Sequence, residues 1–171
     1  MKSVTRLETL SKLVTEYGEA SYINYQAVRA LGDAVIGALS DYLGSDAQVW
    51  GVPPVGDWKP HNYNDAKYST FGGGLLEIEP IRMGIALAIP HLNDDGELWM
   101  RITVEFECAG SEIRVQVIDA GTVASRDFSE EDVQTICALI YDQIVAIWKR
   151  PLDLGSPMAG NQGKIGFFRP G

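Results

Sequence analysis

The stretch LWMRITVEFECAGSEIRVQV, residues 98–117, alternates between apolar and polar residues on both sides of a short break. The apolar residues are even-numbered before the break and odd-numbered after it. A period of two is typical of strands that bury one face and expose the other. We therefore expect two antiparallel strands joined by a tight turn, with Met100, Val104 and Val115 in the core.

The change from even to odd numbers also restricts the pairing of these two strands. Facing residues must have numbers whose sum is odd, because otherwise one strand would turn its apolar face toward water. A two-residue turn at 109–110 meets this condition and predicts that Phe106 faces Ile113. The same register places Glu105 opposite Arg114, which is a favourable cross-strand pair.

Two further stretches, residues 76–79 and 81–89, show a similar alternation and bring the expected sheet to about four strands. The second stretch also carries a small-residue row, Gly84, Ala86 and Ala88, on its other side. A strand that is apolar on both sides is typical of a central strand that is covered twice. We expect an aromatic loop, the C-terminal tail, a second subunit or a ligand to fill the space above this row.

Helices are predicted at both ends of the chain. Residues 1–45 show the three-and-four spacing of two amphipathic helices, of which the first is ended by Gly18. A third helix is predicted over 129–150, before a proline. Ser129 and Asp132 have the spacing of a capping box at its start.

Strands grouped apart from helices indicate an α+β fold. We expect one domain with two layers: an antiparallel sheet of about four strands, packed by two N-terminal helices and one C-terminal helix. The expected parts are the helices in 1–45, an aromatic loop in 46–74, the sheet in 75–120, the helix in 129–150 and a Gly/Pro-rich tail in 151–171. The fragment 165–168 is too apolar for a free tail, so it should dock on its own domain or on a second subunit.

The charge of the chain limits its partners. The sequence has 14 Lys and Arg against 23 Asp and Glu, a formal net charge of −9. Proteins that bind nucleic acid or a membrane surface rely on basic residues, so neither partner is expected. The acids of residues 91–120 are typical of a solvated surface that keeps the protein soluble, and the alternative interpretation is an acidic face that meets a basic protein partner. The sequence shows no apolar run typical of a signal peptide or a membrane span, and we expect a cytoplasmic protein.

Motifs for catalysis or metal binding are lacking in the sequence. Gly163-Lys164 has neither the preceding glycine nor the following hydroxyl residue of a phosphate loop. Asp57, His61 and Asp65 have a helical spacing, but Pro60 lies among them, so we expect no metal site there. Both cysteines fall on apolar faces, where a thiol behaves as a small hydrophobic group. We expect no cofactor and no metal, and no catalytic residue can be assigned.

The aromatic loop is the remaining candidate for a site, because tryptophan and tyrosine combine apolar area with a polar tip. The candidate ligand-binding residues are Trp50, Trp58, His61, Tyr63, Asp65, Tyr68 and Phe71. Two hypotheses remain. The first is an interaction or binding protein without catalytic activity that forms a homodimer. The alternative is a protein or enzyme that binds a small, apolar molecule in a pocket between the sheet and the loop 50–71.

Overall fold

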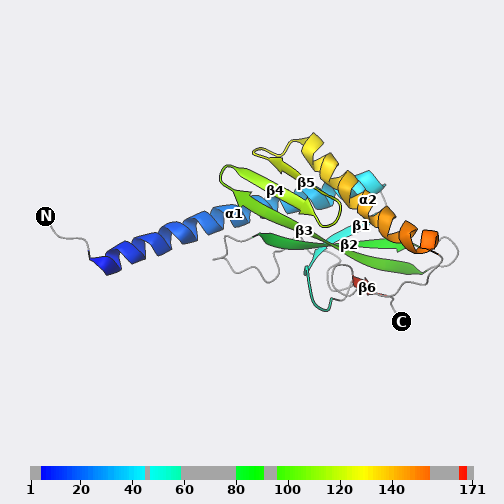
Figure 1. Cartoon of the computed structure of the whole chain (residues 1–171), viewed down its shortest axis with the longest axis horizontal. Helices are drawn as coiled ribbons and strands as arrows, with labels where there is room; N and C mark the ends of the chain where they lie inside the picture. The colour runs from blue at the N-terminus through cyan, green and yellow to red at the C-terminus, as the bar shows by residue number, and fades with distance from the viewer. Residues whose placement is uncertain (1–4, 45–46, 59–79, 91–95, 155–165, 169–171) are drawn as a thin grey trace.

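The computed structural model describes residues 5–44, 47–58, 80–90, 96–154 and 166–168. In chain order the elements are α1 (Arg6–Leu43), β1 (Gln48–Val52), β2 (Ile81–Pro90), β3 (Glu97–Ala109), β4 (Glu112–Val117), β5 (Gly121–Ser125), α2 (Glu130–Leu154) and β6 (Gly166–Phe168). Strands β1 to β5 form one sheet in sequence order, every neighbouring pair is antiparallel, and β6 pairs with β3 (Figure 1). The expected α+β class is confirmed.

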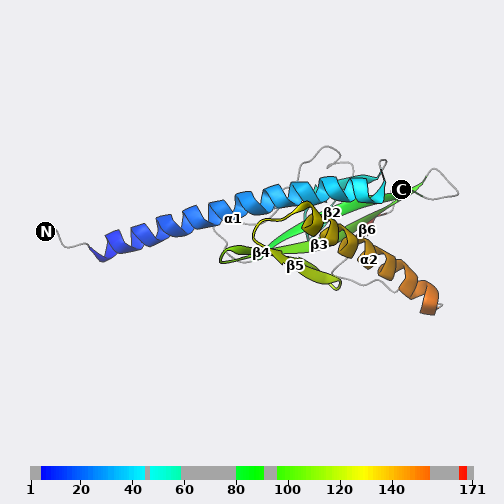
Figure 2. The ribbon, with the colours of Figure 1, turned by 90° about the horizontal axis from the view of Figure 1, so that it is seen from above.

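The main core lies between one face of the sheet and the two helices, which cross over the strands in Figure 2. Every second residue of the strands points into it, and the C-terminal half of α1 and one side of α2 complete it. Fully buried members include Val28 and Val35 of α1, Met83 and Ile85 of β2, and Ile136 and Ile140 of α2. Met100, Val104 and Val115 are also fully buried, as the alternation predicts.

The expectation of two N-terminal helices is wrong, because α1 is one helix of 38 residues. It begins with a capping box between Thr5 and Glu8 and ends at Gly44, whose φ of 120° suits only glycine well. Gly18 lies inside it. An interior glycine costs only about 1 kcal/mol, so a long hydrogen-bonded helix with good residues on both sides continues through it.

The sheet has more strands than expected. Strand β1 lies within the segment interpreted as a loop, and β5 follows a tight turn after β4. Each has only 5 residues, too few to show a clear alternation. The strand expected at 76–79 lies outside the described residues.

The predicted register of β3 and β4 is wrong by two residues, although its parity is right. Val115, and not Ile113, faces Phe106, while Arg114 faces Glu107. The turn is centred on 110–111 because Gly110 takes a φ of 65°, which favours glycine at the first turn position of a type II′ hairpin.

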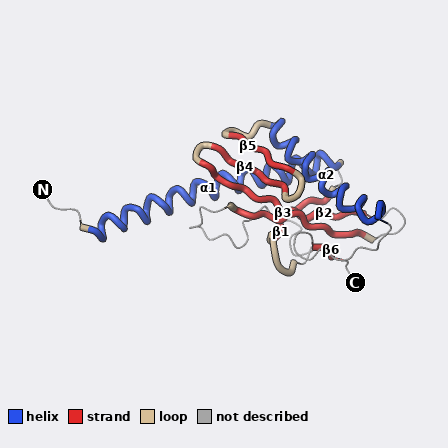
Figure 3. Tube along the Cα trace, viewed as in Figure 1, coloured by secondary structure: helices blue, strands red, loops and turns tan. Residues whose placement is uncertain are grey.

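The C-terminal elements largely follow the expectation. At the start of α2 the Ser129 hydroxyl accepts from the Asp132 amide at 3.1 Å, and the Asp132 carboxylate accepts from the Ser129 amide at 3.0 Å. The helix runs to Leu154, past the predicted end at residue 150. Proline at 151 lacks one N–H donor, and here it is tolerated in the final turns. Further on, β6 pairs with β3 of its own chain (Figure 3).

Candidate functional site

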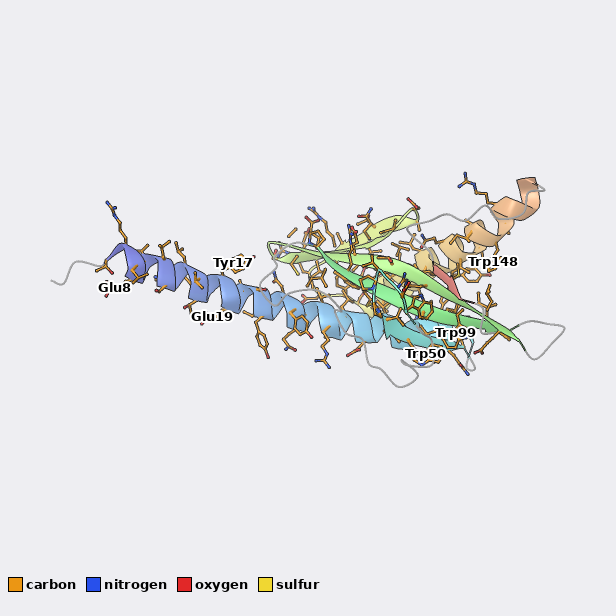
Figure 4. The ribbon with its side chains drawn as sticks, turned by 90° about the horizontal axis from the view of Figure 1, so that it is seen from below. Glu8, Tyr17, Glu19, Trp50, Trp99 and Trp148 are labelled. Atoms are coloured by element: carbon orange, nitrogen blue, oxygen red, sulfur yellow. The ribbon has the colours of Figure 1, made fainter. Side chains whose placement is uncertain are left out.

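A tryptophan cluster, Trp50, Trp58 and Trp99, covers the sheet face opposite the main core. Figure 4 labels Trp50 and Trp99, which lie near each other. Trp50 and Trp99 stack with ring centroids 4.6 Å apart, and Trp58 meets Trp99 edge-on at 6.3 Å. Beneath them lie Ala86 and Ala88, which are buried. The bulky cover expected above the small-residue row is therefore made of indole rings over Ala86 and Ala88, and of the backbone of Val52 and Pro53 over Gly84.

The segment after β1 is fastened across the same face by polar contacts. A guanidinium nitrogen of Arg101 donates to the backbone carbonyls of Pro53 at 3.0 Å and Gly56 at 2.9 Å. The Thr103 hydroxyl donates to the carbonyl of Pro54 at 3.1 Å. The Arg101 guanidinium also lies 5.7 Å from the centre of the Trp58 ring, a distance at which a cation–π attraction acts.

Of the candidate ligand-binding residues, the structure brings Trp50 and Trp58 together around Trp99. The other candidates, His61, Tyr63, Asp65, Tyr68 and Phe71, lie outside the described residues. The proposed pocket between sheet and loop therefore stays a prediction.

Trp99 and Arg101 were missed by the sequence analysis because they lie on the polar side of their strand. One signal could have found Trp99. A large aromatic residue on the face that carries the small-residue row has space to lie flat there.

Polar groups gather elsewhere on this face of the sheet. A hollow of about 190 Å³ is lined by Pro80, Glu105, Glu107, Arg114, Gln116 and Thr122. Ligand pockets usually enclose about 300–1,000 Å³, so this hollow is small for a metabolite. Its carboxylates are already paired: Glu105 with Arg82 at 2.6 Å and Glu107 with Arg114 at 3.4 Å.

The described residues hold no cluster of three or more His, Cys, Asp or Glu side chains that could bind a metal ion. Burial raises the pKa of the Cys137 thiol to about 11, and burial also raises the pKa of Cys108. Thiols with raised pKa values are poor nucleophiles at neutral pH, which agrees with the structural role expected for both.

Most of the exposed large apolar side chains in the described residues belong to α1. Its N-terminal half extends beyond the sheet in Figures 1 and 2, with Glu8, Tyr17 and Glu19 far from the tryptophans in Figure 4. Leu7 is 73% exposed and Val14 is 69% exposed. We call the α1 stripe the set Leu7, Leu10, Leu13, Val14 and Tyr17, all of which are exposed.

The α1 stripe lies on the same side of the helix as the part of α1 that enters the core. Leu10 and Val28 are about five turns apart, and so are Tyr17 and Val35, at about 3.6 residues per turn. Val28 and Val35 are fully shielded from solvent. The same side of the helix is therefore packed in the second half of α1 and bare in the first.

Polar side chains on the other sides of residues 6–20 find partners within the helix. Lys12 and Glu16 form an ion pair one turn apart at 3.5 Å. The hydroxyls of Thr9 and Thr15 donate to carbonyls of the preceding turn at 3.2 and 3.0 Å. The segment is thus amphipathic, and its apolar side has no cover from the described residues.

Neither a family model, nor a curated protein, nor a solved structure matches this chain. Within the described ranges, neither α1 nor α2 contains an apolar stretch of the length that a membrane span requires.

Proposed function

We propose that this chain is an interaction protein without catalytic activity, and that two copies associate through the α1 stripe. The observation that carries this proposal is the bare N-terminal half of an apolar helix face whose C-terminal half is core. Contiguous exposed apolar surface of this kind marks interaction sites in soluble proteins.

The length of the exposed segment supports a helical partner. An isolated helix of about 12–15 residues is marginally stable in water, and most helices in proteins are stabilised by packing of their apolar side. Leucine, valine and tyrosine at alternating spacings of three and four form the kind of seam that packs against another helix. A second copy of α1 offers the same seam, and a two-fold axis makes it self-complementary.

The distribution of charge supports a second copy as the partner. The whole chain carries −9, so contact between two sheets would bring like charges together. Residues 6–20 contain two basic residues, Arg6 and Lys12, against three acids, Glu8, Glu16 and Glu19. This segment is nearly neutral, and pairing there costs little in charge repulsion.

The double variant Leu10→Glu/Val14→Glu tests the proposal. We expect light scattering to give twice the chain mass for the wild type and the mass of one chain for the variant. The control, Thr9→Glu/Thr15→Glu, adds the same charge to the polar side of the same turns and should stay dimeric. Near-ultraviolet circular dichroism of the tryptophan cluster checks that both variants remain folded. A monomeric wild type, or a variant that stays dimeric, would falsify the proposal.

The alternative proposal, a small apolar ligand held beside the tryptophan cluster, rests on Trp50, which is only partly buried. A thermal-shift screen of ligand classes tests it. A binding protein should respond to at least one class, and the response should be lost in a Trp58→Ala/His61→Ala variant. Identical shifts in both proteins for every class would exclude this alternative.

A further inference from the structure

Strand β3 has an edge that β4 covers only in part. It has 13 residues, from Glu97 to Ala109, whereas β4 has 6 and pairs with residues 104–109. On that side the first half of β3 pairs with β6, through residues 99–101 alone. Among the described residues, 97–98 and 102–103 have no strand partner there. The backbone groups of every second residue of a strand point to the same edge, so those of Glu97 and Thr103 face this side and are open to an added strand.

We propose that the β3 edge, residues 97–103, is a strand-addition site for an extended basic peptide with aromatic residues. In the isolated chain the tail strand β6 occupies this site. The partner segment resembles the tail itself, which reads GKIGFFRPG over residues 163–171. Binding by strand addition draws its affinity from backbone hydrogen bonds and its specificity from side chains along the added strand.

The edge is held in a fixed shape by packing on both faces of β3. Met100 and Ile102 are buried in the main core. Trp99 on the opposite face is 1% exposed beneath Trp50, and Thr103 is bonded to the covering segment. A receptor strand that is already rigid loses little conformational freedom when a peptide pairs with it, which favours binding.

Charge complementarity favours a basic partner. Residues 151–171 carry Lys164 and Arg169 against Asp153, a net charge of +1. Because the whole chain carries −9, residues 1–150 carry −10. An extended segment with basic flanks is thus attracted to the body of the protein, and the tail has those flanks.

The tail strand is short enough to be displaced. Pairing of β6 involves 3 residues, and a separate peptide along 97–103 could pair with more. The tail stays on the edge despite this short pairing because it is tethered to the same chain, which gives it an effective concentration of about millimolar. A free peptide with the same sequence competes with the tail for this edge, and it replaces the tail when its concentration exceeds this effective concentration.

The experiment uses a fluorescent peptide with the sequence of residues 163–171 and measures its anisotropy with two full-length proteins. The wild type has its own tail on the edge, and the variant Phe167→Asp/Phe168→Asp has a tail that is acidic and no longer aromatic. We expect the peptide to bind the variant about tenfold or more tightly than the wild type, since the tethered competitor is removed. Equal affinity for both proteins, or no binding to the variant, would overturn the proposal.

Two controls separate strand addition from general charge attraction. A peptide with the same composition but a scrambled order should bind at least severalfold more weakly; equal binding would contradict the proposal. Hydrogen exchange should show faster exchange at residues 97–103 in the tail variant and renewed protection when the peptide is added. Protection elsewhere, with none at this edge, would also contradict it.

The same variant distinguishes this site from the proposed dimer interface. A tail that pairs within its own chain predicts that Phe167→Asp/Phe168→Asp leaves the mass in solution unchanged. If this variant becomes monomeric while Leu10→Glu/Val14→Glu stays dimeric, the tail joins two copies. That outcome would contradict both the dimer through the α1 stripe and the pairing of the tail within its own chain.

Discussion

Trp50 and Trp99 stack with ring centroids 4.6 Å apart, although strand β2 lies between their strands. Neighbouring strands are about 4.8 Å apart, so strands β1 and β3 are separated by about twice that distance. The two indole rings meet because the residues between them are alanines: Trp50 pairs with Ala86, and Trp99 pairs with Ala88. The small-residue row of β2 is the floor on which the two rings lie.

A larger side chain in this floor should separate the rings. We expect Ala86→Leu to lower the free energy of unfolding by about 1–3 kcal/mol, because the site is fully buried and has no space for more atoms. Near-ultraviolet circular dichroism should report the lost stacking. The matched control is Ala124→Leu on the exposed side of β5, with an expected change within about 0.5 kcal/mol. Equal effects at both positions would show that the floor does not require alanine.

Gly84 allows the chain after β1 to cross β2 closely. A Cβ atom at this position would lie 2.7 Å from the backbone oxygens of Val52 and Pro53, and backbone cannot move aside cheaply. We expect Gly84→Ala to destabilise the protein by about 1–3 kcal/mol in denaturant unfolding. Gly37 in α1 has open space around its Cβ position, so Gly37→Ala should stabilise by about 0.5–1 kcal/mol. The decisive result is that Gly84→Ala lowers the free energy of unfolding whereas Gly37→Ala raises it.

The capping box of α2 should make stability depend on pH. Hydrogen bonds from the Ser129 backbone, and then from its side chain, hold the pKa of Asp132 below its ordinary value of 3.8. A lowered pKa in the folded state means that the contribution is present above about 3.8 and is lost as the pH falls through the folded-state pKa. We expect Asp132→Asn to weaken the loss of unfolding free energy on acidification below that pH.

Urea unfolding at a series of acidic pH values measures this effect. Asp142→Asn removes one negative charge from an exposed position of the same helix and serves as the control. The difference between the two variants reports the cap alone. If the free energy of unfolding falls equally steeply with acidification in the wild type and in Asp132→Asn, the role assigned to Asp132 is contradicted.

The cysteines should differ in accessibility. Cys137 is fully buried, its thiol lies 4.0 Å from the Val35 carbonyl, and its pKa is about 11. Cys108 is only partly buried. We expect a thiol reagent to label Cys108 first in the native protein, at a rate that rises with pH, and to reach Cys137 only on unfolding. Mass spectrometry of digested protein identifies the labelled position, and early labelling of Cys137 would refute this order.

Much of the fold is predictable from the sequence, because local periodicity and caps act within a few residues. The alternation in 98–117 predicts two strands and their buried face, and the spacing of Ser129 and Asp132 predicts the start of α2. The register of the hairpin between β3 and β4 does not follow from this local periodicity. It depends on whether Gly110 is the first or the second residue of the turn, and parity alone allows both pairings.

The sequence by itself determined the α+β class, the buried side of each long strand and the need for a cover above Gly84, Ala86 and Ala88. Only the tertiary structure decided that Trp99 supplies part of this cover, that α1 is one helix, and that half of its apolar face lies beyond the sheet. The physical reason is that a repeat along the chain specifies which side of an element is apolar. What that side meets depends on where the other elements end in space.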